Sequence, residues 1–471
     1  IFIKKSNLKS ELMKMLKKIA REDNFLSLTG NLVIAVLGIS GFALLARILS
    51  LDVFGEWVLF VTGGSFVEMF RFGITNTGLI RFLSGADVDS RTKLIGSNAL
   101  IGLGATVLIA IILVFCYTVF NDAIINSGYH LFFKWYPLLA FVNLPWNNAL
   151  VVLQADRKYD KILIIKSINS GLFFLVILAN FFFIEMKLNE LVIALILINA
   201  FTSLITIILG WDGTKLITKA STKTNKILLD FGKYTTFTLI GTNLLRSADI
   251  LIISLSPLGN TAVALYSIPL KITELQQIPL RSFVATAFPK MSKASVQGKV
   301  KEVKDLFYTY SGALTYLFVI MSLFTFLFAD FLVLILSGEQ YLKVDPITGF
   351  NVVDIVRVFS IYGLLLPIDR MTGICLDSIN KPNINAIKVF VMVAANIIGD
   401  FIAIFVFKSL ILVAVASIIF TLIGIWMGMY FLNKELTLSY KEIFSHGINF
   451  YKTLFNKVTH NRFVESYKFN K

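Results

Sequence analysis

Cysteine, histidine and charge are all scarce in this 471-residue sequence, and each shortage excludes a class of protein. The two cysteines, Cys116 and Cys375, both fall in apolar stretches, so neither a disulfide framework nor a cysteine metal site is expected. The three histidines (His130, His446 and His460) lie outside those stretches, which argues against a membrane-embedded enzyme that uses histidine as acid or base. No G-x-x-x-x-G-K-[ST] motif occurs, so the chain does not encode an ATP-driven pump. We therefore predict a protein that is not an enzyme and needs neither a metal nor a cofactor.

The shortage of charge is matched by an excess of apolar residues. Charged residues make up 15% of the chain and hydrophobic residues 56%, and the mean hydropathy is +0.77. Soluble domains have roughly 25% and 45–50%. Apolar runs of about twenty residues recur throughout, and runs such as IGLGATVLIAIILVFCYTVF (101–120) do not alternate as the strands of a membrane barrel would. The composition predicts an all-α polytopic membrane protein, because helices satisfy their own backbone hydrogen bonds in hydrocarbon.

Hydropathy predicts about twelve transmembrane helices in two groups of six. A cytoplasmic linker at 211–228 separates an N-terminal bundle (25–210) from a C-terminal bundle (229–432). A basic amphipathic segment (1–24) precedes the first span, and a basic tail (433–471) follows the last. The predicted spans are 25–49, 56–82, 95–119, 131–154, 162–184, 188–210, 229–255, 261–288, 306–328, 351–378, 385–407 and 410–432.

The distribution of basic residues predicts the orientation. With the N-terminus in the cytoplasm, 29 Lys and Arg residues fall in cytoplasmic segments and three (Lys187, Lys343 and Lys408) in external ones. This asymmetry follows the positive-inside rule and places both termini in the cytoplasm. The formal net charge of +15 therefore reflects topology and not a nucleic-acid partner. The basic ends of the chain suit binding to anionic membrane lipids, and solvated tails are the alternative.

Charged residues inside the predicted spans come mostly in acid–base pairs. A charge at mid-bilayer costs about 2.5–3.5 kcal/mol on insertion scales, so each one is by default a functional-site hypothesis. Residues three apart share a helix face, which lets a pair neutralise itself in part. Structural contact between helices is the alternative explanation for any single pair. The pairs are Glu68–Arg71, Arg246–Asp249, Lys271–Glu274 and Asp354–Arg357, with Asp369–Arg370 adjacent in sequence.

Depth distinguishes these pairs. Glu68–Arg71 and Lys271–Glu274 lie at similar depth in the second and eighth spans, which indicates an internal repeat with a site near the midplane. Arg246–Asp249 lies closer to the external side, where an outer gate is an equally good interpretation. Prolines in the eighth span (Pro269 and Pro279) suggest kinks beside a lined cavity.

Lys and Arg outnumber carboxylates inside the spans, and this surplus suits an anionic cargo, because guanidinium groups hold phosphate oxygens in pairs. Some of the cations near span ends could instead reach the membrane interface. The predicted cargo-contacting cations are Arg71, Arg246, Lys271, Arg370, Arg47 and Arg281. The predicted charge-balancing or titrating carboxylates are Glu68, Asp249, Glu274, Asp369 and Asp400.

Two stretches carry a family likeness. LLARILSLDVFGEWVLF (44–60) and SADILIISLSPLGNTAVALYSIPLKITELQQIPLRSFVATAFPKMS (247–292) resemble polysaccharide flippases of the O-antigen-repeat-unit type. A third segment (379–422), with Asn396 and Asp400, is similar to the later spans of that family. These flippases belong to the multidrug/oligosaccharidyl-lipid/polysaccharide (MOP) exporter superfamily. The chain departs from the pattern at SLDVFGEW, which lacks the usual Gly-Pro, and at KSLILVAVAS, which lacks glycine.

The resemblance implies two six-helix bundles around a central cavity that opens alternately to each side. The implied cargo is a lipid-linked oligosaccharide on an undecaprenyl-pyrophosphate carrier. It is moved to the outer leaflet of the bacterial inner membrane for surface polysaccharide synthesis, and polysaccharide polymerase machinery is a further implied partner. An ion-coupled drug or metabolite antiporter of the same architecture is the alternative. A membrane glycan polymerase is disfavoured, because the longest external loop (329–350) leaves no room for a catalytic domain.

Overall fold

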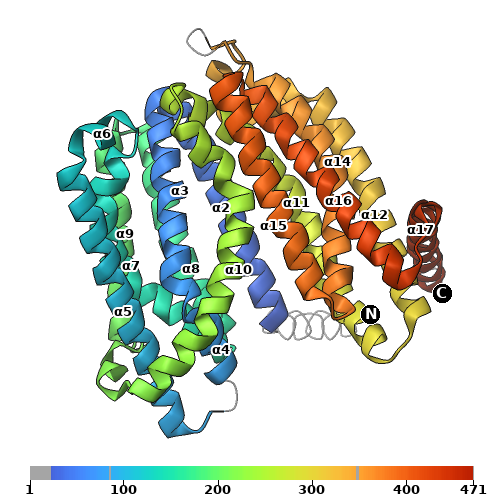
Figure 1. Cartoon of the computed structure of the whole chain (residues 1–471), viewed down its shortest axis with the longest axis horizontal. Coiled ribbons are helices and arrows are strands. Elements are labelled where there is room, and N and C mark those ends of the chain that lie inside the picture. Colours follow the sequence, from blue (N-terminus) through green and yellow to red (C-terminus); the bar gives the residue numbers. More distant parts are fainter. Residues whose placement is uncertain (1–22, 84–85, 346–348, 470–471) are drawn as a thin grey trace. The chain divides into compact units, whose positions relative to one another are not determined.

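The computed structural model describes residues 23–83, 86–345 and 349–469, without the side chains at 23–32, at 457–469 and at several positions between 234 and 246. The described residues form helices joined by short connections (Figure 1). The predicted amphipathic segment at 1–24 lies almost entirely outside this part of the chain, as does the side chain of Arg246.

The chain divides into two compact units, residues 1–243 and 244–471. The first unit contains α2 to α9, the short η1 and the first part of α10. Its helices are α2 (Asp23–Ile48), α3 (Leu51–Gly73), α4 (Asn76–Leu83), α5 (Val88–Val119), α6 (Asn121–Asn126), α7 (His130–Ala155), α8 (Tyr159–Phe182), α9 (Leu188–Ile208), η1 (Thr214–Lys219) and α10 (Thr222–Ser254).

The second unit begins within α10 and runs to the end of the chain. It holds α11 (Gly259–Val296), α12 (Val300–Leu327), α13 (Ala329–Ser337), η2 (Glu339–Tyr341), α14 (Val352–Ser378), α15 (Pro382–Phe401), η3 (Ile402–Val406), α16 (Leu410–Leu436) and α17 (Tyr440–Phe469). The η3 segment is a π-helical turn that continues α15.

Each of the twelve predicted spans coincides with a helix or with two consecutive helices. The second span is divided into α3 and α4 by a turn at Ile74–Thr75, and the eleventh comprises α15 and η3. Eight helical stretches in the described part are long and apolar enough to cross a membrane without other evidence. The all-α polytopic fold is therefore confirmed.

Helix α10 explains why the division between the units differs from the predicted linker at 211–228. In its first half, Phe231 packs edge-on against Phe82 of α4, with ring centroids 5.5 Å apart, and Gly232 lies against the backbone of Ile74. In its second half, Asp249 and its neighbours pack among helices of the second unit. One continuous helix thus contributes its two halves to different cores.

Candidate functional site

A buried arginine organises the centre of the first unit. The Arg71 side chain on α3 has no exposed surface, and all of its nitrogens have partners. Its Nε and Nη2 donate to Thr106 Oγ1 on α5 at 3.1 and 2.8 Å, and Nη2 also donates to the Ala140 carbonyl on α7 at 2.6 Å. Its Nη1 pairs with Glu68 at 2.7 Å. Arg71 therefore joins three helices.

Glu68 collects the polar groups of α7. Tyr136 Oη lies 2.8 Å from Glu68 Oε1, and Asn143 Nδ2 lies 3.4 Å from the same oxygen. The predicted Glu68–Arg71 ion pair is thus confirmed, but in this conformation the guanidinium is enclosed by protein. Contact between Arg71 and a cargo stays a prediction, and it would require this network to open. The arrangement is that of a structural lock between α3, α5 and α7.

The second unit holds a buried cluster of a different kind. Asp249 of α10 and Asp400 of α15 are 5% and 0% exposed, and their carboxyl groups share the side-chain amide of Asn396. Tyr266 Oη of α11 donates to Asp249 Oδ2 at 2.8 Å. Asn396 Nδ2 donates to Asp249 Oδ1 at 3.2 Å and to Asp400 Oδ2 at 2.9 Å. Four side chains from three helices thus form this cluster, and two of the four are acids.

This acid pair needs positive charge. Two buried carboxylates that share one amide donor repel each other when both are ionised, so a proton or a bound cation would stabilise the pair. Among the described side chains, no Lys or Arg pairs with either acid, and even a pairing with the undescribed Arg246 side chain would leave one carboxylate unmatched. The Oδ1 atoms of Asn396 and Asp400 are buried without a hydrogen-bond partner in the described part.

The donor set defines which cation fits. All the free acceptors are carboxylate or amide oxygens, which suit a proton or a hard monovalent ion such as Na⁺. No group of three or more His, Cys, Asp or Glu side chains is found among the described residues, so a polydentate transition-metal site does not arise there. Asp400 lies where α15 passes into the π-helical η3, and such turns are frequent at functional sites.

A lysine that was not among the predicted site residues determines the state of Asp369 and Arg370. Lys388 of α15 is 2% exposed, and its Nζ lies 2.7 Å from Asp369 Oδ1 and 3.1 Å from Thr372 Oγ1. Asp369 is therefore neutralised by a neighbouring helix and not by the adjacent Arg370. Arg370 is exposed and makes no ion pair with the residues that the structure describes.

Arg281 resembles Arg370 in this respect and lies at a similar height. It is exposed on α11 without an ion pair among the described residues. Gly363 of α14 lies against Gln276 of α11. Arg370 follows Gly363 by seven residues and Arg281 follows Gln276 by five. Because the two helices run in the same predicted direction, the arginines lie at similar heights. Lys271 and Glu274 form the predicted ion pair at 2.9 Å on α11 and are partly exposed.

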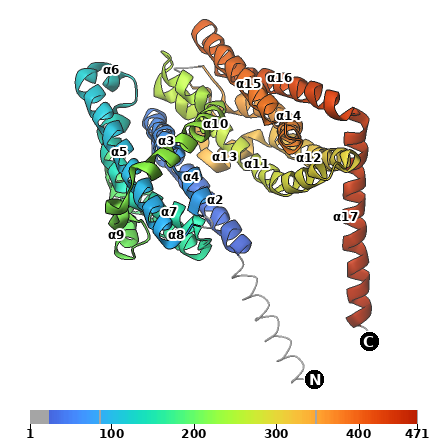
Figure 2. The same cartoon turned by 60° about the horizontal axis from the view of Figure 1, so that its bottom comes forward.

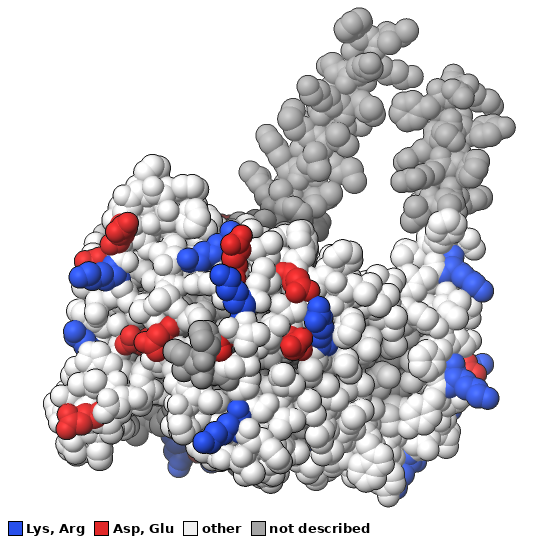
Figure 3. All heavy atoms as spheres, turned by 90° about the horizontal axis from the view of Figure 1, so that it is seen from above, with Lys and Arg blue, Asp and Glu red and all other residues white. Residues whose placement is uncertain are grey.

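The remaining predicted residues are Arg47, Arg246 and the pair Asp354–Arg357. Arg47 is exposed near the end of α2, and the position of the Arg246 side chain stays undescribed. Arg357 pairs with Asp354 at 3.3 Å and with Asp330 of α13 at 2.9 Å, which confirms one pair and adds a partner to it. In the view of Figure 3 most side chains are uncharged, and several of the acidic and basic side chains lie next to one another.

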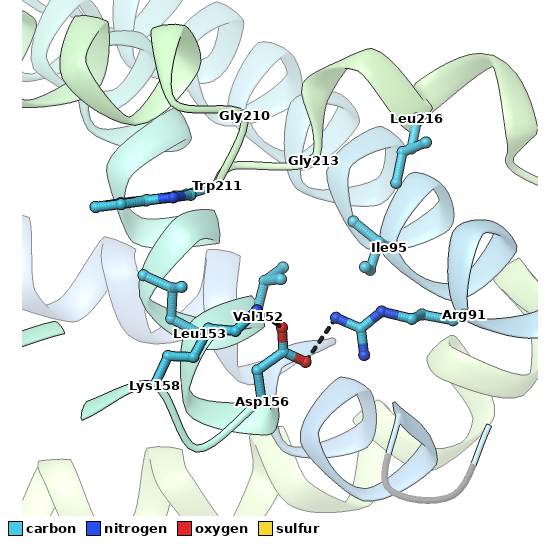
Figure 4. A pocket seen from close by; sticks show the side chains of 10 residues that line it. All are labelled: Arg91, Ile95, Val152, Leu153, Asp156, Lys158, Gly210, Trp211, Gly213 and Leu216. Atoms are coloured by element: carbon cyan, nitrogen blue, oxygen red, sulfur yellow. Dashed lines mark hydrogen bonds and ion pairs between the residues drawn. The ribbon is translucent and has the colours of Figure 1, made fainter. Parts of the chain in front are cut away.

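A small cavity of about 190 Å³ lies in the first unit beside the connection from α9 to η1 (Figure 4). Arg91 and Lys158 both bind Asp156, at 2.6 and 2.8 Å, and Trp211 lines the other side. Burial by itself would raise the pKa of Asp156, but the hydrogen bonds and charges of Lys158 and Arg91 outweigh it and hold the pKa below the ordinary carboxyl value. Arg91, Lys158 and Asp156 are thus paired with one another, and these ion pairs join α5 to the connection that follows α7.

Sequence reasoning did not assign site roles to Tyr266, Asn396, Lys388, Tyr136 or Asn143. A search for polar side chains one helical turn from each intramembrane acid would have found Asn396, four residues before Asp400. The other four lie on different helices from the acids they contact, 17 to 75 residues away in sequence, and no local pattern marks them.

Comparison with known proteins agrees with this architecture. A family model described as "Polysaccharide biosynthesis protein" matches residues 21–295, more than half of the chain. No curated protein sequence gives a significant match.

Solved structures show the same fold at low sequence identity. An inward-facing multidrug resistance MATE family transporter of the MOP superfamily aligns with a TM-score of 0.69 and 14% identity, over 85% of this chain and 95% of that one. The lipid II flippase MurJ, in an inward closed conformation, aligns with a TM-score of 0.68 and 15% identity over 92% of each chain. A MOP superfamily transporter from Pyrococcus furiosus gives 0.54 and 13%, over 88% of this chain and 95% of that one.

The structural likeness establishes a transporter fold, and the family model covers the first unit, α10 and most of α11. The chain is therefore a multi-pass membrane protein of the polysaccharide biosynthesis protein family, and its fold is similar to that of the MATE transporter and of MurJ.

Proposed function

We propose that this protein is a cation-coupled flippase that carries a lipid-linked oligosaccharide across the bacterial inner membrane by alternating access. The observation that carries the proposal is the separation of charges within the second unit. Two acids face each other without a described base, whereas Arg370 is exposed without an acid because Lys388 already neutralises Asp369. One cluster suits a coupling cation, and the other suits an anionic cargo.

The cargo assignment follows from the chemistry of guanidinium. Arg281 and Arg370 present exposed cations without a described ion pair, which can hold the oxygens of a pyrophosphate. The Lys271–Glu274 pair on α11 adds a site for hydroxyl groups of a sugar. The undecaprenyl-pyrophosphate carrier and transfer to the outer leaflet are part of this proposal. So are cytoplasmic termini and delivery of the cargo to a polysaccharide polymerase.

The coupling assignment follows from electrostatics. Binding of a proton or Na⁺ between Asp249 and Asp400 neutralises a buried charge and stabilises the contact between α10, α11 and α15. Release of the cation leaves two like charges in one small space, which favours separation of these helices. Differential stability of the two states is what a gradient needs to drive a conformational cycle.

The test uses purified protein in proteoliposomes with a fluorescent lipid-linked oligosaccharide and, in separate vesicles, a cationic dye. We expect translocation of the oligosaccharide that responds to an imposed Na⁺ or proton gradient, weakened in Arg370→Ala and uncoupled in Asp400→Asn. Gradient-driven movement of the dye without the oligosaccharide would favour the antiporter and overturn the flippase assignment. Oligosaccharide transport unaffected by either gradient would overturn the coupling assignment alone.

A further inference from the structure

The last helix of the chain crosses the bundle of the second unit and does not run along it. In Figure 1, α17 is seen nearly end-on while α12 runs across the picture, and in Figure 2 it is seen in full length. The two helices cross where Gly447 lies directly against the backbone of Gly312, so that neither position has room for a side chain. Tyr451 Oη donates to the Ala313 carbonyl at 2.8 Å, which fixes the crossing.

The crossing coincides with the boundary between the charged and uncharged parts of α12. Residues 300–310 contain two lysines, a glutamate and an aspartate, whereas residues 311–328 contain no charged residue. Eighteen helical residues span about 27 Å, close to the thickness of the hydrocarbon core. Tyr308 and Tyr310, at the boundary, are typical of a membrane interface. The helix α17 therefore lies at the level where hydrocarbon meets headgroups.

One face of α17 is largely exposed, although Phe444 also meets Tyr316 of α12 edge-on, with ring centroids 6.5 Å apart. Ile443, Gly447 and Tyr451 face α12, whereas the neighbouring stripe of Phe444, Ile448 and Phe455 is 47%, 43% and 69% exposed. The spacing of four and seven residues places these three side chains on one side of the helix. Lys441 and Lys452 are exposed along the edge of this stripe, and Asn449 lies on the polar side.

We propose that α17 is an interfacial helix that binds anionic phospholipids of the cytoplasmic leaflet. Its apolar stripe enters the boundary between headgroups and acyl chains, and Lys441 and Lys452 contact the phosphates of acidic headgroups. We assign the lipid surface as the partner for two reasons. The stripe lies at the level where the apolar part of α12 begins, and the charged side chains described along its edge are Lys441 and Lys452. The inference does not depend on the identity of the cargo.

Depth measurements on the full-length protein test the apolar contact. Single cysteines replace Phe444, Ile448 or Asn449 in a background with Cys116→Ser and Cys375→Ala, and each carries an environment-sensitive fluorophore in vesicles containing doxyl-labelled lipid. We expect several-fold stronger lipid quenching at 444 and 448 than at the matched control 449. Equal quenching at all three positions would overturn the proposal. So would protection of 444 and 448 from both lipid and aqueous quenchers, since that result indicates a covering protein.

Charge substitution tests the lipid class. Quenching at position 444 is compared between phosphatidylcholine vesicles and vesicles containing phosphatidylglycerol, with and without Lys441→Gln and Lys452→Gln. We expect anionic lipid to raise the quenching about twofold or more, and the double substitution to remove that increase. Lys293→Gln with Lys434→Gln, two exposed lysines on other helices, serves as the matched control and should preserve it. If the control pair and the α17 pair behave alike, recognition of anionic headgroups by α17 is refuted, whereas thermal unfolding of each variant identifies any that are misfolded.

Discussion

In each unit a carboxylate binds a tyrosine hydroxyl and an asparagine amide, but the remaining partner of that carboxylate differs between the units. In the first unit, Glu68 meets Tyr136, Asn143 and the base Arg71. In the second, Asp249 meets Tyr266, Asn396 and a second acid, Asp400. The first cluster contains its own counter-charge, whereas the described side chains of the second include two acids and no base.

The comparison concerns the partner of the carboxylate. Arg71 beside Glu68 makes an ion pair that holds helices together, which we call the structural lock, whereas Asp400 beside Asp249 makes a pair of like charges. A buried ion pair is broken only at a high cost, because each partner is left without its counter-ion in a medium of low dielectric. A buried acid pair changes its net charge whenever a proton or ion enters or leaves, and its helices feel attraction or repulsion accordingly. The same surrounding residues can therefore hold a bundle together or let it respond to an ion gradient.

The largest effect is expected from neutralising the acid pair. Asp400→Asn keeps the size and most hydrogen bonds of the side chain but removes the charge that a coupling cation must balance. We expect gradient-driven transport to fall by about 100-fold, which corresponds to about 2.7 kcal/mol, with little change in the unfolding temperature. Asp249→Asn should give the same phenotype. Full gradient-driven transport in both variants would show that the pair has no role in coupling.

The next effect concerns the lock. Arg71→Met leaves the partly buried Glu68 without its counter-ion and removes three further hydrogen bonds of Arg71. We therefore expect the free energy of unfolding to fall by about 3–5 kcal/mol. Chemical denaturation in detergent measures this. The paired variant Arg71→Met with Glu68→Leu should recover most of the loss, because no unpaired charge remains. A double variant as unstable as the single one would mean that packing, and not charge pairing, determines the stability here.

A smaller effect is expected at the exposed cations. Arg370→Ala should reduce transport of lipid-linked oligosaccharide by about tenfold, equivalent to loss of one charge-assisted contact of about 1.4 kcal/mol. Arg357→Ala is the matched control, because Arg357 is on the same helix but is already paired with Asp354 and Asp330. Lys388→Met should also lower transport, since the freed Asp369 would compete with cargo for Arg370. Equal losses in the Arg370 and Arg357 variants would refute a specific role for Arg370.

The smallest effect is expected from the ion pairs of Asp156 with Arg91 and Lys158, beside the small cavity of the first unit. Asp156→Asn should lower the free energy of unfolding by less than about 1 kcal/mol at pH 7. Because the pKa of Asp156 is lowered in the folded protein, its contribution is complete above the ordinary carboxyl pKa of about 4 and disappears as pH falls through the lowered value. Thermal unfolding of the variant and the wild type should therefore differ at pH 7 and converge near pH 2. A difference that persists unchanged at low pH would contradict this cause.

Local pairings were predictable from the sequence, because residues three apart on a helix must share a face. The ion pairs Glu68–Arg71, Lys271–Glu274 and Asp354–Arg357 all form. The adjacent pair behaves otherwise: neighbouring residues point about 100° apart on a helix, so Asp369 turns to Lys388 and Arg370 remains exposed. The sequence located these charges but not which of them lack a partner.

By itself the sequence determined the membrane class, the place of the long apolar helices and the presence of costly charges inside them. These properties follow from the transfer free energy of short segments, which depends on local composition alone. Only the tertiary structure decided that Arg71 is enclosed, that Asp249 meets Asp400, and that α17 crosses α12 at a pair of glycines. Such contacts join helices far apart in the chain, and they are fixed by the packing of whole helix faces, which no local pattern encodes.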